Sequence, residues 1–220
     1  MQEYKKEFIK FLIDNKSLKF GEFTLKSGRL SPYFLNTGML YSGEAVAKLG
    51  KFYAQAIIDN VKDDYNVIFG PAYKGIPLAV SCAGALYSEF SLSKDYSFNR
   101  KEAKGHGDIG MLVGKQLESA DKLVLIDDVI TAGTAIRESI DILKSVGGPK
   151  IVAVVVSVDR MEKGKGEKSA IQELREILGI DFYPIVSIVE IIEYLEENKD
   201  LISEELLGKM YKYREEYGVS

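Results

Sequence analysis

The sequence predicts an α/β fold with a mostly parallel central sheet flanked by helices. Three short runs of apolar and often β-branched residues, at 66–69, 123–126 and 151–158, have the length and composition of buried parallel strands. Segments with the helical spacing of apolar residues separate these runs, and such strand–helix alternation is typical of a parallel sheet. Loops that follow parallel strands gather at one edge of the sheet, so we expect the functional residues there.

The other elements follow from local periodicity. Alternation at Phe23 and Leu25, and again at Tyr33 and Leu35, predicts two strands joined by a Ser-Gly turn. Residues 183–188 predict a strand at the edge of the sheet. Apolar residues at helical spacing predict helices over residues 4–15 and 43–60, a segment from Ile76, a segment from Thr134 that carries Ile136, Ile140 and Leu143, residues 169–178, and two acidic segments near the C-terminus.

Composition limits the class of protein. The chain has 220 residues, which suits one α/β domain or a domain with a small appendage. A formal net charge of −4 argues against a general nucleic-acid binder. The single cysteine, Cys82, cannot form an intrachain disulfide, and the sequence has neither a signal region nor an apolar run of membrane-spanning length. We therefore expect a cytoplasmic protein that binds neither membrane nor nucleic acid.

Residues 123–135 combine a strand, two carboxylates and a helix start. Asp127 and Asp128 fall where the strand should end, and the small, hydroxylated residues 131–134 open the next helix. The free N–H groups and dipole of a helix N-terminus suit a phosphate, whereas two carboxylates suit hydroxyls, a metal or a developing cation. Together these preferences describe a ribose 5-phosphate. Acidic residues also end strands in other α/β proteins, including the Walker B strands of nucleotide hydrolases, so the carboxylates alone leave that alternative open.

Two further segments carry cations. Lys74 and Gly75 follow the strand at 66–69, where a cation and free N–H groups make a second anion site plausible; the alternative is a tight turn with an exposed lysine. In residues 94–114, basic side chains crowd together between glycines, which favours a loop that is mobile when empty and ordered by a polyanion. From the residue types alone, we expect the side chains of Lys26 and Arg29 to be solvent-exposed at the surface turn. The strand at 151–158 delivers Asp159 and Arg160 to the same sheet edge as Asp127 and Lys74.

These segments together resemble the orotate phosphoribosyltransferases of the bacterial pyrimidine pathway, within the type I phosphoribosyltransferase family. Residues 123–135 look like the family's signature for 5-phospho-α-D-ribose 1-diphosphate (PRPP). The similarity extends over essentially the whole chain, through residues 18–34, 69–77, 98–107, 127–138, 157–160 and 170–174. The resemblance implies a type I phosphoribosyltransferase fold in one domain, 1–220, with a small N-terminal hood formed largely by 1–40 and a mobile catalytic loop at about 100–112.

The resemblance also implies an activity and a set of residues. The activity is Mg²⁺-dependent transfer of the 5-phosphoribosyl group from PRPP to orotate, giving orotidine 5′-phosphate and pyrophosphate in de novo UMP synthesis. The implied PRPP contacts are Lys26, Tyr73, Lys74, Arg100, Lys101, Lys104, His106, Asp127, Asp128, Val129, Ile130, Thr131, Ala132, Gly133, Thr134 and Ala135. The implied orotate contacts are Phe34, Leu35, Thr131 and Arg160, and the implied catalytic residues are Lys26, Lys104, His106, Asp127 and Asp128.

Further expectations come from the same resemblance. The mobile loop reaches the neighbouring subunit's site, which implies a homodimer with shared active sites. Mg²⁺ is expected to be held mainly by PRPP and water, without a dedicated protein site. Leu35 departs from a position that is often Phe in the family, with a loss of about 1 kcal/mol of ring stacking.

Two rival functions are open to test. A purine phosphoribosyltransferase would share the PRPP segment, but Lys26 and Arg160 favour a base that carries a carboxylate. A PRPP-sensing regulator that binds nucleic acid would need a helix-turn-helix extension or a basic face, neither of which the sequence indicates.

Overall fold

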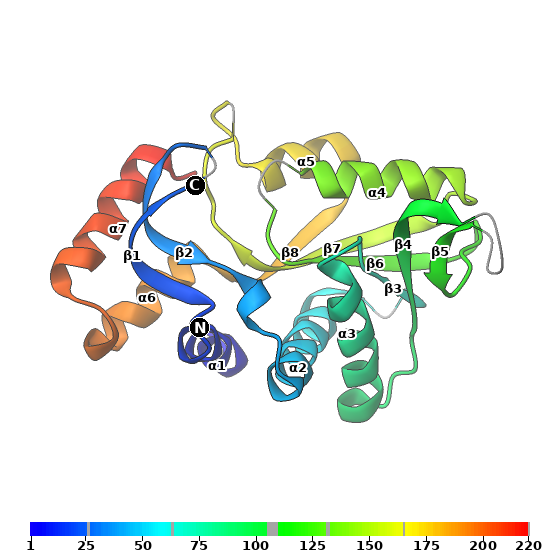
Figure 1. Ribbon diagram of the computed structural model, residues 1–220, viewed down its shortest axis with the longest axis horizontal. Helices are drawn as coiled ribbons and strands as arrows, with labels where there is room; N and C mark the ends of the chain where they lie inside the picture. Colours follow the sequence, from blue (N-terminus) through cyan, green and yellow to red (C-terminus); the bar gives the residue numbers. More distant parts are fainter. Residues whose placement is uncertain (26, 63, 105–109, 131–132, 165, 220) are drawn as a thin grey trace.

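The computed structural model describes residues 1–25, 27–62, 64–104, 110–130, 133–164 and 166–219. Within these residues, a six-stranded sheet has the strand order β5-β4-β3-β6-β7-β8 (Figure 1). Only the β4–β5 pairing is antiparallel, so the predicted α/β class with a mostly parallel sheet is confirmed. The strands of this sheet are β3 (Val67–Phe69), β4 (Asp95–Lys104), β5 (Gly110–Gly114), β6 (Lys122–Asp127), β7 (Lys150–Asp159) and β8 (Asp181–Ser187).

Helices cover both faces of the sheet, with α4 and α5 on one side and α1, α2 and α3 on the other (Figure 1). Serine side chains start four of the helices by accepting a hydrogen bond from the backbone N–H three residues later: Ser42, Ser169, Ser187 and Ser203. In the parts of the chain that the structure describes, no helix has both the length and the apolar content to span a bilayer. The helices are α1 (Glu3–Asp14), α2 (Gly43–Asn60), α3 (Gly75–Phe90), α4 (Thr134–Ser145), α5 (Ala170–Leu178), α6 (Ile188–Glu197) and α7 (Glu204–Tyr217), with short 3₁₀ helices η1 (Thr37–Met39) and η2 (Lys199–Leu201).

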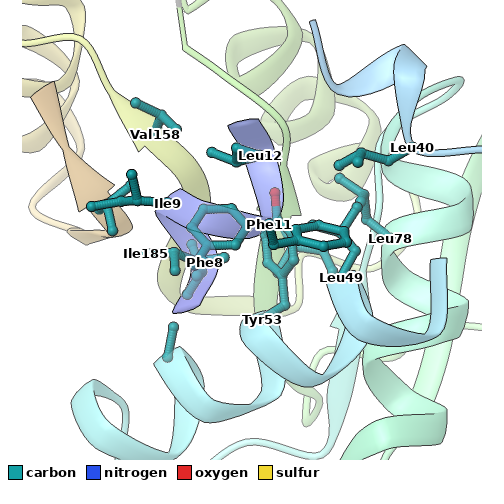
Figure 2. Close-up of a cluster of buried hydrophobic side chains, with 14 of the residues drawn as sticks. Phe8, Ile9, Phe11, Leu12, Leu40, Leu49, Tyr53, Leu78, Val158 and Ile185 are labelled. Carbon is teal, nitrogen blue, oxygen red and sulfur yellow. The ribbon is translucent and has the colours of Figure 1, made fainter. Parts of the chain in front are cut away.

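The central strands are apolar on both faces because both faces are covered. In β6, Leu123 and Leu125 join the core under α4 and α5, whereas Val124 and Ile126 join the core on the opposite face. Successive side chains of a strand point to opposite sides, so an uninterrupted apolar run fills both cores. The larger core brings α1, α2 and α3 onto β7 and β8, as Figure 2 shows for Phe8, Ile9, Phe11, Leu12, Leu40, Leu49, Tyr53, Leu78, Val158 and Ile185.

A second, two-stranded antiparallel sheet stands beside the first. It pairs β1 (Leu18–Thr24) with β2 (Leu30–Leu35), as the alternation in this region predicts. Helices α6 and α7 lie against the same side of the molecule, so the unit formed by the N-terminal residues is completed by the C-terminal helices (Figure 1). Tyr33 of β2 packs edge-on against Tyr213 of α7, with ring centroids 6.1 Å apart.

The interpretation of residues 94–114 as one loop is wrong for most of the segment. Residues 95–104 and 110–114 are the strands β4 and β5, and they pair from Ser97↔Gly114 to Lys104↔Gly110. The regular pairing covers Ser97 to Asn99 and resumes at Lys104, and the stacked rings of Tyr96 and Phe98 add apolar contact before the basic residues begin. Of the predicted mobile loop at 100–112, residues 105–109 lie outside the described part of the chain.

Close approach of α2 and α3 requires a glycine at position 50. A methyl group there would lie 2.5 Å from the Ser81 carbonyl oxygen. We expect Gly50→Ala to lower the free energy of unfolding by about 1–3 kcal/mol through overpacking. Gly208 in α7 is the matched control, since its methyl group would meet no atom within 4 Å. Gly208→Ala should raise stability by about 0.5–1 kcal/mol, because alanine is the better helix former. Urea denaturation gives the free energy of unfolding of each variant. Equal changes in this free energy for Gly50→Ala and Gly208→Ala would contradict the packing argument.

Candidate active site

The backbone at the end of β6 is held from both sides. The Tyr53 hydroxyl donates to the Asp127 carbonyl oxygen at 2.7 Å. The Ser157 N–H and hydroxyl both donate to the Asp128 carbonyl oxygen, at 2.9 and 2.5 Å. Tyr53 comes from α2 and Ser157 from β7, so a helix and a neighbouring strand fix the two carboxylates in place.

The side chain of Asp128 joins three separate segments. Its Oδ2 accepts from Lys74 Nζ at 2.5 Å and from Thr37 Oγ1 at 3.0 Å. Lys74 precedes α3, Thr37 begins η1, and Asp128 follows β6. The prediction that Lys74 and the Asp pair share one edge of the sheet is therefore confirmed.

The two carboxylates lie in a poorly solvated environment, with Asp127 and Asp128 exposed by only 8% and 7%. Burial, and then the negative charge of Asp128, raise the pKa of Asp127 to about 6. The Asp128 N–H donates to Asp127 Oδ1 at 2.8 Å and works against this rise. Two carboxylates so placed would stabilise a cation or a positive charge that develops beside them.

The carboxylate pair also bears on Mg²⁺. Within the described residues, no three His, Cys, Asp or Glu side chains gather as a metal site. Mg²⁺ is usually bound through one or two carboxylates together with substrate phosphates and water. Asp127 and Asp128 supply that donor set, so they fit an ion held largely by a phosphorylated substrate.

The helix after the carboxylates begins as the sequence predicts. Gly133 adopts a left-handed conformation (φ 70°) at the N-cap of α4. The left-handed conformation favours glycine here, and a methyl group at Gly133 would also lie 2.8 Å from Leu174 Cδ1, so that side chain would have to move. The first N–H groups of α4, from Thr134 and Ala135, have no partner within the helix, as at any helix N-terminus. Val129 and Ile130 are partly buried between the carboxylates and this turn.

A cavity of about 270 Å³ lies beside this turn. Its lining includes Arg100 and Lys101 of β4, Ala72 and Ala135. Arg100 Nη1 is buried and has no hydrogen-bond partner among the residues the structure describes, so it is available to an anion. Lys101 Nζ lies 3.8 Å from Glu138.

The loop before α3 adds two groups to this region. The Ala72 N–H donates to Asn99 Oδ1 at 3.0 Å, which ties the loop to β4. Tyr73, next to the predicted Lys74, has 71% of its surface exposed. It is therefore accessible to a ligand at this edge.

The predicted base contacts divide between two places. Arg160 follows β7 and lies over the Tyr33 ring, with its guanidinium carbon 4.3 Å from the ring centroid. Phe34 instead stacks on Phe23, with ring centroids 5.5 Å apart. Because neighbours on a strand point to opposite faces, the Phe34 ring and Arg160 lie on opposite sides of β2, and Leu35 shares the Tyr33 side.

Some predicted residues cannot be placed. Lys26, His106, Thr131 and Ala132 lie outside the described residues. Lys104 ends β4, and only its backbone is described.

Sequence reasoning missed four residues that organise the site: Thr37, Asn99, Ser157 and Glu162. No local pattern marks Thr37, whereas Asn99 and Ser157 lie within segments 98–107 and 157–160, which carry the resemblance. A signal existed for Glu162, because it lies two residues beyond Arg160 and follows the same strand.

The sheet, the carboxylate pair and the glycine-started helix define a class of protein, and comparison identifies the class. Residues 36–188 match the family model described as the phosphoribosyl transferase domain. The orotate phosphoribosyltransferase of Clostridium acetobutylicum is 46% identical over 223 residues, with both chains covered completely. That of Photobacterium profundum is 50% identical over 219 residues, again across 100% of both chains. The chain belongs to the orotate phosphoribosyltransferase family.

A solved structure agrees with this assignment. The crystal structure of orotate phosphoribosyltransferase from Francisella tularensis superposes with a TM-score of 0.86 at 42% identity. The alignment covers 97% of this chain and 100% of that one. The predicted type I phosphoribosyltransferase fold is confirmed.

The buried Asp127 carboxyl should make stability depend on pH. Its pKa is about 6 in the folded chain, against 3.8 for an ordinary Asp, so folding binds its proton more tightly. This contribution to stability is complete below about pH 4 and is lost as the pH rises through about 6. Asp127→Asn does not titrate, so the stability of this variant relative to the unaltered chain should increase between about pH 4 and pH 7. Urea denaturation across that range, with the exposed Asp200→Asn as control, measures the difference; parallel profiles for Asp127→Asn and the unaltered chain would sink the prediction.

Proposed function

We propose that this chain transfers the 5-phosphoribosyl group from PRPP to orotate, at the edge of the sheet where β6 ends. The observation that carries the proposal is the buried pair Asp127–Asp128 beside the N-terminus of α4, with Lys74 bonded to Asp128. The helix N-terminus would bind the 5-phosphate of PRPP, and the two carboxylates would bind its ribose hydroxyls. Family membership supports the same assignment.

The reaction breaks the bond between C1 of the ribose and the diphosphate oxygen, and a ring nitrogen of orotate bonds to C1. Breaking the first bond ahead of the second gives the sugar oxocarbenium character, as in glycoside hydrolysis. Asp127 and Asp128 would stabilise that positive charge electrostatically. Neither residue has to act as a nucleophile.

The diphosphate leaves with the electron pair of the broken C1–O bond, so its negative charge increases and must be stabilised. Lys74 and Tyr73 from the loop before α3 would bind it, and Arg100 and Lys101 of the 100–112 segment would close over it. The unpartnered Arg100 Nη1 supports this role. Mg²⁺ carried by PRPP would neutralise further charge, with Asp127 and Asp128 as the protein carboxylates available to it.

Orotate is proposed to lie near the end of β7, where Arg160 supplies a cation for its carboxylate. The backbone of Phe34 and Leu35 would border the ring, since the Phe34 side chain turns to Phe23. Lys26 and Thr131 complete the proposed base contacts. Lys104 and His106 complete the diphosphate contacts, as the resemblance implies.

A homodimer with shared active sites completes the proposal. Val80 and Tyr87 lie seven residues apart on α3 and are 44% and 66% exposed, and Tyr73 in the loop before this helix is 71% exposed. Side chains at this spacing share one helix face, so α3 presents an apolar stripe to solvent in a single copy of the chain. A second copy of the chain would cover it and bring the partner's 100–112 segment to this site. We place the enzyme in the cytoplasm, where the buried Cys82 stays reduced.

The first test is the loss of orotate's ultraviolet absorbance on incubation with PRPP and Mg²⁺. Adenine, hypoxanthine and uracil serve as competing bases. We expect orotate to be consumed and the other bases to remain, because Arg160 favours a base that carries a carboxylate. Turnover of a purine instead would overturn the base assignment while leaving the PRPP site intact. PRPP binding without turnover of any base would favour a regulator.

Shared sites predict complementation between two inactive variants. Lys104→Ala removes the loop cation, and Asp128→Asn removes a carboxylate from the site itself. Each homodimer should lose most of its kcat. Co-expression should restore about one quarter of the normal activity, because half of the dimers are hybrids and each hybrid has one complete site. If the co-expressed variants have no more activity than the two separate homodimers, each active site is built from a single subunit and the proposal of shared sites is wrong.

A further inference from the structure

The carboxylate of Glu162 lies where the β1–β2 hairpin meets the end of β7. Its Oε1 accepts from Arg160 Nε at 2.9 Å and from the Tyr33 hydroxyl at 2.8 Å, and Arg160 Nη2 lies 2.6 Å from the same oxygen. Its Oε2 lies 3.8 Å from Arg29 Nη1. The side chains of Arg160 and Glu162 are only 11% and 13% exposed. One largely buried carboxylate therefore binds Arg160 and Tyr33 closely and lies within reach of Arg29.

These contacts fix the plane of the Arg160 guanidinium. Nε and Nη2 both point to Glu162, and Nη2 also donates to Ser31 Oγ at 3.3 Å. The Tyr33 ring supports one face of the guanidinium. The remaining amino group, Nη1, donates no hydrogen bond within the described part of the chain, although the Tyr213 hydroxyl lies near enough to Arg160 for the guanidinium to act against the rise in the pKa of that tyrosine. The orientation of the Arg160 guanidinium is thus fixed, and its Nη1 amino group is left to bind a ligand.

The segment that carries Glu162 is itself pinned. Glu162 forms a β-bridge with Gly218, and the Lys163 N–H donates to the Tyr217 carbonyl oxygen at 2.8 Å. The Val219 N–H donates to the Met161 carbonyl oxygen at 2.8 Å. Glu162 is therefore held by backbone contacts that do not depend on a ligand.

The local charge balance favours an anion. Arg29 and Arg160 face one carboxylate, which leaves the cluster with a surplus positive charge. Arg29 is occupied elsewhere, since its Nη1 donates to the Lys163 carbonyl oxygen at 2.9 Å and its guanidinium lies over the Tyr217 ring. Glu162 pairs closely with Arg160 and only distantly with Arg29, so the surplus positive charge is that of Arg29 and adds to the potential beside Arg160.

We propose that Glu162 is a positioning residue for base selection. It holds the Arg160 guanidinium so that Nη1 is presented to the carboxylate of the base. The inference rests on the proposed function, in which Arg160 contacts orotate. Among the described residues, Glu162 contacts none of the groups assigned to PRPP, and its contact with a group assigned to orotate is the one with Arg160.

Glu162→Gln tests this with little change of shape. A neutral amide forms weaker bonds to a guanidinium and offers one acceptor oxygen, so Arg160 gains freedom. We expect KM for orotate to rise about tenfold, with KM for PRPP and kcat changed less than about twofold. Tyr33→Phe is the matched control: it removes another hydrogen bond to Glu162 Oε1 but leaves the Arg160–Glu162 pair, so KM for orotate should stay within about twofold.

A double-mutant cycle separates positioning from general stability. In an Arg160→Ala background, Glu162→Gln should change KM for orotate less than about twofold, because the residue that it positions is gone. A KM for orotate that is unchanged in Glu162→Gln, or a tenfold effect that persists without Arg160, would overturn the proposal. If the unaltered chain fails to consume orotate at all, the proposed function fails instead, and the two results are distinguishable.

Discussion

The site depends on one constraint, which is the burial of two adjacent carboxylates at the end of β6. Burying charge is unfavourable unless each group finds partners. Here Tyr53 and Ser157 hold the backbone, while Lys74 and Thr37 satisfy the Asp128 side chain. Each partner comes from a different element, so the carboxylate pair is stable only when the helices, the sheet and η1 have assembled around it.

The double-sided core makes that assembly rigid. Leu125 and Ile126 of β6 belong to different cores on opposite faces of the sheet. The strand can therefore neither shift register nor tilt without disturbing both layers. Asp127, the last residue of this strand, is therefore held by both layers as well as by its bond from Tyr53.

Much of the fold and part of the site could be predicted, for a common reason. Apolar runs and helical spacing are local signals, and the rule that parallel strands end at one edge places Asp127, Lys74 and Arg160 together without further information. Thr37 could not be found in this way, because its bond to Asp128 spans 91 residues and depends on tertiary packing. Residues 94–114 were misjudged because cations and glycines suggest a loop, whereas cross-strand pairing outweighs both.

The ion pair between Lys74 and Asp128 means that the site carries its own counter-ion. A polyanion that arrives at this edge does not meet two bare carboxylates, since one of them is already neutralised. The Lys74 side chain remains 61% exposed, so it can turn from Asp128 toward a phosphate. Ligand capture at this position is then an exchange of partners within the protein, and it draws less on the release of dissolved salt ions than the binding of a free lysine to an anion would.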